Sequence, residues 1–317
     1  MMEGFYRGIN LGGWLSQCDY SRERLDHFIR EEDFRTIASW GLDHVRLPVD
    51  YNVLEEQPED AKAGGPVGLG RVVRAVGLAR KHGLNVVVDL HKTPGYSFDA
   101  GEKEAGFFES EKYQERFYEL WERLAEAFGD DPEHILFDLL NEITDREVLP
   151  QWQRVSAECV RRIRKYAPDT RILIGSYDYN DVRAVADLDL PEDDRLVYSF
   201  HCYEPHFYTH QGAYWDAGID RDRRVSFEEA NIDDRYFDRL FETAVRKAAE
   251  EGRELYCGEF GVIDVVPPED AIRWFRVLHR AFERYGIGRA VWSYREMDFG
   301  LADARMDGVR DELLTLL

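Results

Sequence analysis

The stretch Asn85-Val86-Val87-Val88-Asp89-Leu90-His91 is a short apolar run that ends in polar side chains. Its three consecutive β-branched residues favour a β-strand. A run that is apolar on both faces is typical of a parallel strand covered by helices. Amphipathic stretches flank it at 69–82 and 113–128. In the second stretch, apolar residues recur at spacings of three and four, which predicts one buried helical stripe. The stripe residues are Phe117, Leu120, Leu124 and Phe128.

The same alternation of apolar run and amphipathic stretch continues along the chain. The predicted strands are 5–11, 44–49, 85–90, 135–140, 171–175, 196–200, 255–258 and 288–292. The predicted helices are 23–39, 69–82, 113–128, 151–166, 234–251 and 269–285, with a weaker candidate near 180–188. Eight strand–helix units within 317 residues predict a single-domain (β/α)₈ TIM barrel over residues 1–317. The alternative is a doubly wound open sheet, but no Gly-x-Gly-x-x-Gly follows the first strand to support its dinucleotide-binding form.

Composition excludes several classes of partner. The chain has 41 Lys and Arg against 63 Asp and Glu, a net charge of −22. This charge repels nucleic acid and anionic lipid surfaces, so we expect neither as a partner. No apolar run reaches the roughly 20 residues that span a bilayer. The beginning of the sequence shows no leader, so we expect a cytoplasmic protein as written, or a secreted one if a leader has been removed.

The cysteines are widely separated. They are Cys18, Cys159, Cys202 and Cys257, and no two form a Cys-x-x-Cys pair. This spacing disfavours a zinc site or a dense disulfide framework and fits isolated thiols in a reducing compartment. We expect a monomer that needs no cofactor.

Polar and aromatic residues end nearly every predicted strand. In a (β/α)₈ barrel these ends meet on the face that carries the chemistry. Each such residue has a simpler explanation taken singly: a structural histidine, an internal ion pair, a core tryptophan. Their convergence on one face favours a functional site. The residues are Arg46, His91, Asn141, Glu142, His201, Tyr203, Glu259 and Trp292.

Two glutamates among them suit the cleavage of an acetal. That reaction needs one carboxyl group to protonate the leaving oxygen and one carboxylate to attack or stabilise the anomeric carbon. Glu142 and Glu259 end the fourth and seventh strands, across the barrel mouth. An adjacent Arg46 would keep Glu259 ionised, whereas Glu142, beside Asn141, has no such fixed charge. The sequence therefore predicts Glu142 as the acid and Glu259 as the nucleophile.

These residues resemble those of glycoside hydrolase family 5, a family of retaining barrel hydrolases. The eight residues above match the eight active-site residues that mark the family. The resemblance implies that Glu142 is the acid/base and Glu259 the nucleophile, and that Asn141 binds the sugar 2-hydroxyl. It also implies that His91 and His201 orient the sugar and the acid/base. Trp292 would offer a flat face to a sugar ring.

Further motifs resemble the cellulase C type of endoglucanase within that family, which implies a β-1,4-glucan, mixed-linkage β-glucan or gluco-oligosaccharide substrate. They include 44–48, 207–211, 255–262 and 290–294. Two features depart from the resemblance. Ile143 stands where the family commonly has proline, and the connection from His201 to about Asp233 is shorter than the inserted subdomain of that type.

An aromatic loop follows the sixth strand and predicts contacts with sugar rings. We expect His210 and Trp215 to touch substrate, while the other aromatic residues of 204–215 anchor the loop.

Other activities remain open on the sequence. A β-mannan, a β-1,3-glucan or an exo-acting glucosidase substrate would use the same mechanism, and a transglycosylase would pass the intermediate to a sugar. A metal-dependent hydrolase would use His91, Glu142, His201 and Glu259 as ligands, although Arg46 opposes a cation there. A non-catalytic sugar-binding barrel is disfavoured because both carboxylates are present.

Overall fold

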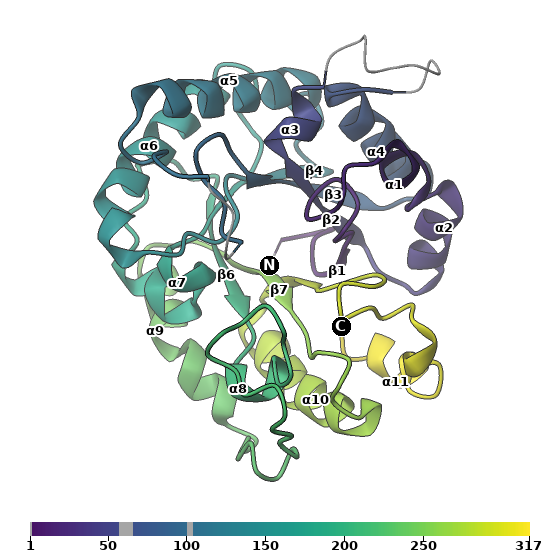
Figure 1. Ribbon diagram of the computed structural model, residues 1–317. Helices are drawn as coiled ribbons and strands as arrows, with labels where there is room; N and C mark the ends of the chain where they lie inside the picture. The colour runs from purple at the N-terminus through teal and green to yellow at the C-terminus, as the bar shows by residue number, and fades with distance from the viewer. Residues whose placement is uncertain (1, 57–65, 100–103) are drawn as a thin grey trace.

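The protein is a closed barrel of eight parallel strands in chain order, as predicted (Figure 1). We describe it from a computed structural model, in which residues 2–56, 66–99 and 104–317 are described. Each strand pairs with its neighbours in the sequence, and β8 pairs with β1. The strands are β1 Arg7–Asn10, β2 His44–Asp50, β3 Asn85–Lys92, β4 Ile135–Asp138, β5 Ile172–Ile174, β6 Leu196–Cys202, β7 Leu255–Phe260 and β8 Gly288–Val291.

Helices surround the strands in a ring (Figure 1). The α-helices are α1 Arg22–His27, α2 Glu31–Ser39, α3 Tyr51–Leu54, α4 Leu69–Lys81, α5 Glu111–Phe128, α6 Leu149–Ile163, α7 Tyr177–Asn180, α8 His206–Thr209, α9 Tyr236–Glu250, α10 Pro268–Tyr285 and α11 Arg310–Leu314. Short 3₁₀ helices lie at η2 Arg146–Val148, η3 Val182–Asp187 and η4 Ala304–Met306. Among the described residues, no helix combines the length and apolar character that a membrane crossing requires.

The predicted helix 23–39 is wrong in one respect, because it is two helices. Arg30 has extended backbone angles (φ −122°, ψ 173°) and begins α2 as its N-cap. The carboxylate of Asp33 accepts a hydrogen bond from the Arg30 amide at 2.8 Å. This cap satisfies an amide that a continuous helix would have bonded internally. The chain therefore turns between α1 and α2.

The weak helix candidate near 180–188 is the 3₁₀ helix η3. Asp181 caps it, since its carboxylate accepts from the Arg183 amide at 2.7 Å. A full α-helix of two or more turns does not form here, and η3 packs instead against the neighbouring α9 and β6. The fifth strand is therefore followed by short helical turns and not by a long α-helix.

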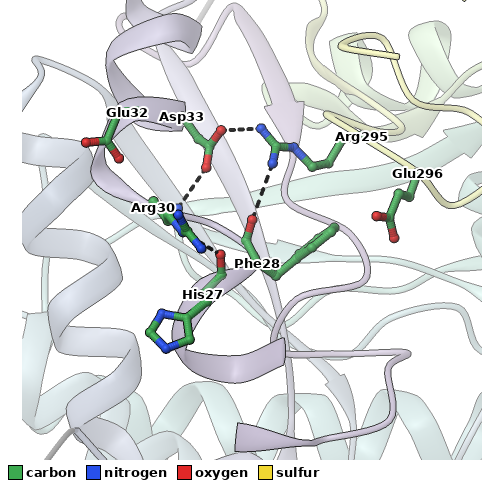
Figure 2. Close-up of a pocket in the computed structure, with 7 residues that line it drawn as sticks. All are labelled: His27, Phe28, Arg30, Glu32, Asp33, Arg295 and Glu296. Carbon is green, nitrogen blue, oxygen red and sulfur yellow. Dashed lines mark hydrogen bonds and ion pairs between the residues drawn. The ribbon is translucent and has the colours of Figure 1, made fainter. Parts of the chain in front are cut away.

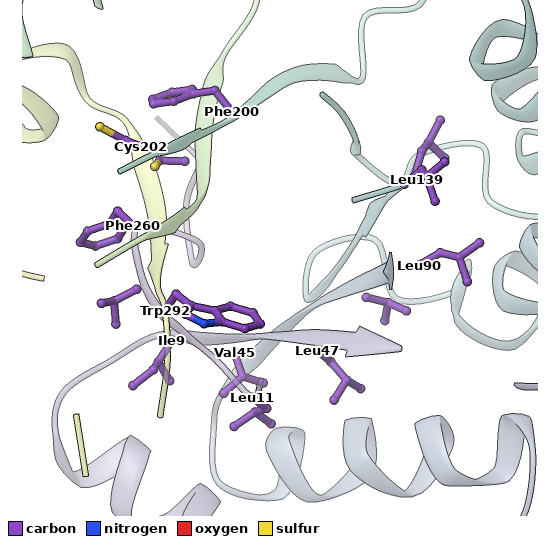
Figure 3. Close-up of a cluster of buried hydrophobic side chains, with 14 of the residues drawn as sticks. Ile9, Leu11, Val45, Leu47, Leu90, Leu139, Phe200, Cys202, Phe260 and Trp292 are labelled. Carbon is purple, nitrogen blue, oxygen red and sulfur yellow. The ribbon is translucent and has the colours of Figure 1, made fainter. Parts of the chain in front are cut away.

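Alternation along the strands divides the core into two clusters. On β3, Val86 and Val88 join a large cluster between the strands and the helices, whereas Val87 points into the barrel. Figure 3 shows part of the outer cluster, with Val45 and Leu47 on the same side of β2. Side chains from six strands and from the beginning of the chain form the inner cluster, which fills the barrel. Its members are Met2, Phe5, Val87, Leu136, Leu173, Val197, Tyr256 and Ala290.

The barrel interior becomes polar toward the carboxyl ends of the strands. Asn10, Arg46, Asp89 and Asp138 are all fully buried. Asn10 pairs with Arg46 in the register of β1 and β2, and Asp89 pairs with Asp138 in that of β3 and β4. A layer of polar side chains thus lies above the inner apolar cluster, at the end of the barrel where such folds carry their active sites.

Candidate active site

Arg46 occupies the centre of the polar layer. Its guanidinium contacts three carboxylates, those of Glu259 at 2.7 Å, Asp138 at 3.0 Å and Asp89 at 3.1 Å. It also donates to the Oδ1 atoms of Asn10 and Asn141, at 3.0 Å and 2.9 Å. Burial alone would lower the pKa of Arg46, but the three carboxylates outweigh it and raise that pKa. Arg46 is therefore a fixed positive charge.

Glu259 is held by two donors, one on each oxygen. Arg46 Nη1 donates to Oε1 at 2.7 Å, and Tyr203 Oη donates to Oε2 at 2.9 Å. Glu259 is 5% exposed. These contacts fix the direction of both oxygens.

A register shift between β6 and β7 aims Glu259 into this position. Phe200 pairs with Cys257, but the next residue, His201, pairs with Glu259. The skipped residue is Gly258, where a Cβ atom would lie 3.0 Å from the ring of His201. Bulges of this kind redirect a side chain near active sites.

Glu142 lies beyond the end of β4, with its side chain only 12% exposed. Its backbone has φ of +43°, a left-handed conformation that costs a non-glycine residue about 1–3 kcal/mol. Burial raises the pKa of Glu142 to about 8, Asp99 and Asp89 add to the effect, and Arg46 opposes it. Glu142 therefore carries a proton at neutral pH.

His201 joins the two glutamates. Its Nδ1 lies 2.8 Å from Glu142 Oε1 and 3.7 Å from Glu259 Oε2. Burial lowers the pKa of His201 to about 4, so the ring is neutral between the two carboxyl groups. One side-chain atom from each of the three residues lies within 4.8 Å of the other two.

The metal alternative finds part of its ligand set together. Glu142, His201 and Glu259 are close enough to share an ion, but His91 is not in that group. His91 is instead engaged by Asp89 at 2.6 Å and by Gln17 at 3.3 Å. The charge of Arg46 on Glu259 also disfavours a second cation at this place.

The remaining predicted residues of the barrel mouth lie at the carboxyl ends of β3, β4 and β8. Trp292 and His91 lie parallel, with ring centroids 5.9 Å apart and planes 3° apart. Burial lowers the pKa of His91 to about 3. Asn141 uses Oδ1 on Arg46, and its buried Nδ2 has no partner within residues 2–56, 66–99 and 104–317. That amide is free to donate to a ligand.

His210 and Trp215 lie in the loop after β6. The His210 ring packs edge-on against Tyr203 at 4.8 Å between centroids, and it contacts Trp215 at 6.3 Å. His210 is buried, and burial lowers its pKa well below the usual range. Trp215 is 41% exposed. His210 therefore packs on Tyr203, the residue that donates to Glu259, and Trp215 lies nearer the surface.

Asp89 and Asp138 are site residues that the sequence reasoning did not single out. Both belong to apolar strands and are fully buried, and Arg46 is their common partner. A signal for them existed, since an aspartate inside a run of Val, Leu and Phe needs a buried cation or hydrogen-bond donor. Their presence also explains how a fully buried arginine is neutralised.

A separate cavity of about 420 Å³ lies between α1, α2 and the loop after β8 (Figure 2). None of its lining residues is a predicted site residue. Asp33, its most buried carboxylate, already contacts Arg295 and accepts from Tyr294 at 3.0 Å. The cavity therefore lies over the ion pair of Asp33 and Arg295, whose charges already have partners.

A parallel barrel with two closely spaced carboxyl groups at the carboxyl ends of its strands, one ion-paired and one protonated, has the architecture of a barrel glycosidase. Comparison of the chain with known protein families, sequences and solved structures agrees with this conclusion. The chain belongs to the cellulase family, glycosyl hydrolase family 5, whose family model matches residues 8–298. It is therefore a cellulase-like glycoside hydrolase.

Named relatives extend over most of the chain. Cellodextrinase A of Ruminococcus flavefaciens is 51% identical over 286 residues, which cover 90% of this chain and 84% of the relative. Endoglucanase C of Acetivibrio thermocellus is 34% identical over 350 residues, covering 100% and 98%. The solved structure of Thermotoga maritima Cel5A in complex with cellobiose has 25% identity and a TM-score of 0.81, covering 100% of this chain and 98% of that one. The resemblance to glycoside hydrolase family 5 is confirmed.

Proposed function

We propose that the protein is a retaining glycoside hydrolase of β-1,4-linked and mixed-linkage β-glucans, with Glu142 as acid/base and Glu259 as nucleophile. The spacing of the two carboxyl groups carries the proposal. One oxygen of each lies within 4.8 Å of the other. Retaining enzymes space these groups by about 5–5.5 Å, whereas inverting enzymes need about 6.5–9.5 Å to admit a water.

In the first step, Glu259 attacks the anomeric carbon and forms a covalent glycosyl ester. Arg46 and Tyr203 orient its two oxygens for this attack. Glu142 gives its proton to the departing glycosidic oxygen, for which a pKa of about 8 keeps it protonated at neutral pH.

In the second step, Glu142 takes a proton from a water that attacks the anomeric carbon and frees Glu259. The unpartnered Nδ2 of Asn141 would donate to the sugar 2-hydroxyl. Trp292 would form the floor under the ring, with His91 and His201 orienting the sugar and the acid/base. Trp215, which is exposed at the rim, would stack on a further sugar unit, and His210 would border it.

The substrate assignment rests on the relatives. Two of them are named as a cellodextrinase and an endoglucanase, and both names point to glucans. β-Mannan is the second candidate, since Thermotoga maritima Cel5A has also been solved with a mannotriose substrate.

The test is to measure hydrolysis and product stereochemistry. We expect Glu142→Gln and Glu259→Gln each to lower activity on cello-oligosaccharides by at least about 100-fold, because each removes one proton-transfer or bonding step. In the wild-type protein, NMR during the first minutes should show the β-anomer at the newly formed reducing end.

The matched control is Glu229→Gln, which changes an exposed glutamate whose carboxylate accepts hydrogen bonds from the amide and hydroxyl of Ser226. It should retain full activity. Initial formation of the α-anomer, or near wild-type turnover in either active-site variant, would contradict the proposal.

A further inference from the structure

The turn after Glu142 holds an unfavourable backbone conformation. Glu142 has a φ of +43°. The next residue is Ile143, which lacks the ring by which a proline would fix its own φ. Left-handed angles at a residue with a Cβ atom persist only when the surroundings enforce them. Something outside this turn must therefore fix it.

The hydroxyl of Tyr96 contacts the backbone on both sides of the turn. It donates to the carbonyl oxygen of Glu142 at 2.6 Å and accepts from the amide of Thr144 at 2.9 Å. A third contact comes from α7, where the amide of Tyr179 donates to the carbonyl of Ile143 at 2.9 Å. Of these groups, only the Tyr96 hydroxyl bridges two residues of the turn.

Tyr96 is itself held rigidly. The segment Thr93-Pro94-Gly95-Tyr96 is a tight turn in which the Tyr96 amide donates to the Thr93 carbonyl at 2.9 Å. Gly95 has φ of +80°, as the third position of a type II turn requires, and proline precedes it. The Tyr96 ring packs edge-on against Phe108 at 5.3 Å. The hydroxyl is thus presented at one place.

We propose that Tyr96 is a positioning residue for the proton donor. By bridging the carbonyl of Glu142 and the amide of Thr144, its hydroxyl maintains the backbone angles from which the Glu142 carboxyl reaches His201 at 2.8 Å. Without this bridge the turn relaxes, and the carboxyl leaves the place where the leaving oxygen needs its proton. The inference rests on the proposed function, because it assumes that Glu142 supplies that proton.

The experiment compares substrates that need a proton with one that does not. Dinitrophenolate departs unprotonated, whereas phenolate and a sugar hydroxyl require an acid. We therefore expect Tyr96→Phe to lower kcat/KM for phenyl β-cellobioside by about tenfold or more. This is less than the roughly 100- to 10,000-fold contribution of a general acid, because the carboxyl is displaced and not removed. The kcat/KM for 2,4-dinitrophenyl β-cellobioside should be nearly unchanged. The ratio kcat/KM is used because it reports only the first step.

A second measurement uses azide, which attacks the glycosyl ester without a general base. In Tyr96→Phe, azide should raise kcat for the dinitrophenyl substrate and yield a glycosyl azide, whereas the wild type should respond little. A variant that has merely lost stability would show neither this rescue nor a dependence on the leaving group.

The control is Tyr198→Phe, which removes a hydroxyl hydrogen bond to Glu251 near the opposite end of β6. It should leave both substrates unaffected. Equal losses on the two substrates in Tyr96→Phe, or no loss at all, would overturn the inference while Glu142→Gln still shows the leaving-group dependence. If Glu142→Gln shows none, the proposed function itself fails.

Discussion

Arg46 has no exposed surface, yet its guanidinium contacts three carboxylates. Removing one partner from a buried ion pair costs about 3–5 kcal/mol, because the other charge is left without compensation. Such a cluster is weak evidence for stability, since apolar residues of the same volume often serve as well. Its value here is chemical, because the same cation that neutralises Asp89 and Asp138 also orients Glu259.

Glu142 should reduce stability at neutral pH. The folded protein raises its pKa to about 8 from an ordinary value of 4.5. Between these values the unfolded chain ionises while the folded chain keeps its proton. Ionisation of Glu142 therefore does not affect the folding equilibrium below a pH of about 4.5. The protein then loses stability as the pH rises, until the pH has passed the folded-state pKa of about 8. We expect Glu142→Gln to raise Tm relative to wild type, and to raise it more at about pH 8 than at about pH 5.5.

The control for this measurement is Glu158→Gln. Arg161 lowers the pKa of Glu158 to about 2, so its stabilising effect is present above the ordinary value. Because this ion pair lies at the surface, the effect should be small, on the order of 0–1 kcal/mol, and of opposite sign. A Tm difference for Glu142→Gln that does not change with pH would contradict the assignment of a protonated Glu142.

At the scale of the element, the β7 bulge is the feature that aims the site. Gly258 allows His201 to lie against the strand, since an added Cβ would come within 3.0 Å of its ring. We expect Gly258→Ala to lower kcat/KM by about 10- to 100-fold through a displaced His201, because small misplacements of catalytic groups have effects of this size. Circular dichroism should show an intact fold.

Gly77→Ala is the matched control for that variant. Gly77 lies in α4, and an added Cβ would meet nothing within 4 Å. This change should keep full activity and add about 0.5–1 kcal/mol of stability, because alanine favours a helix over glycine. Full activity in Gly258→Ala would show that the bulge tolerates a side chain.

Strand and helix positions were largely predictable, and their ends were not. The strongest predictions, such as 113–128 for α5 at Glu111–Phe128, follow from periodic burial that is local in the sequence. The break between α1 and α2 depends on a cap formed by Arg30 and Asp33, which an amphipathic pattern over 23–39 conceals.

At the scale of the molecule, we expect the residues around the barrel mouth to set the substrate. We expect barley β-glucan and carboxymethylcellulose to be hydrolysed in preference to laminarin, mannan and xyloglucan, with product sizes recorded by chromatography. Glucose presents an equatorial 2-hydroxyl, and the side-chain amide of Asn141, which has no partner in the described part of the chain, is the donor that would recognise it. Mannose carries that hydroxyl in the axial position.

The Glu259→Gln protein, prepared in the same way, is the control for contaminating glycosidases in this panel. Cleavage of mannan without activity on glucans would reject the substrate assignment and leave the retaining mechanism in place.

The eightfold alternation and the residues at the strand ends could be read from the chain, because burial periodicity and strand polarity are local properties. Eight parallel strands then require those ends to meet on one face. The contacts within the face could not be read in the same way. Arg46 and Glu259 are 213 positions apart, and Tyr96 and Glu142 are 46 apart. Which groups touch, and how far burial raises the pKa of Glu142, depend on distances and desolvation that exist only once the barrel has closed.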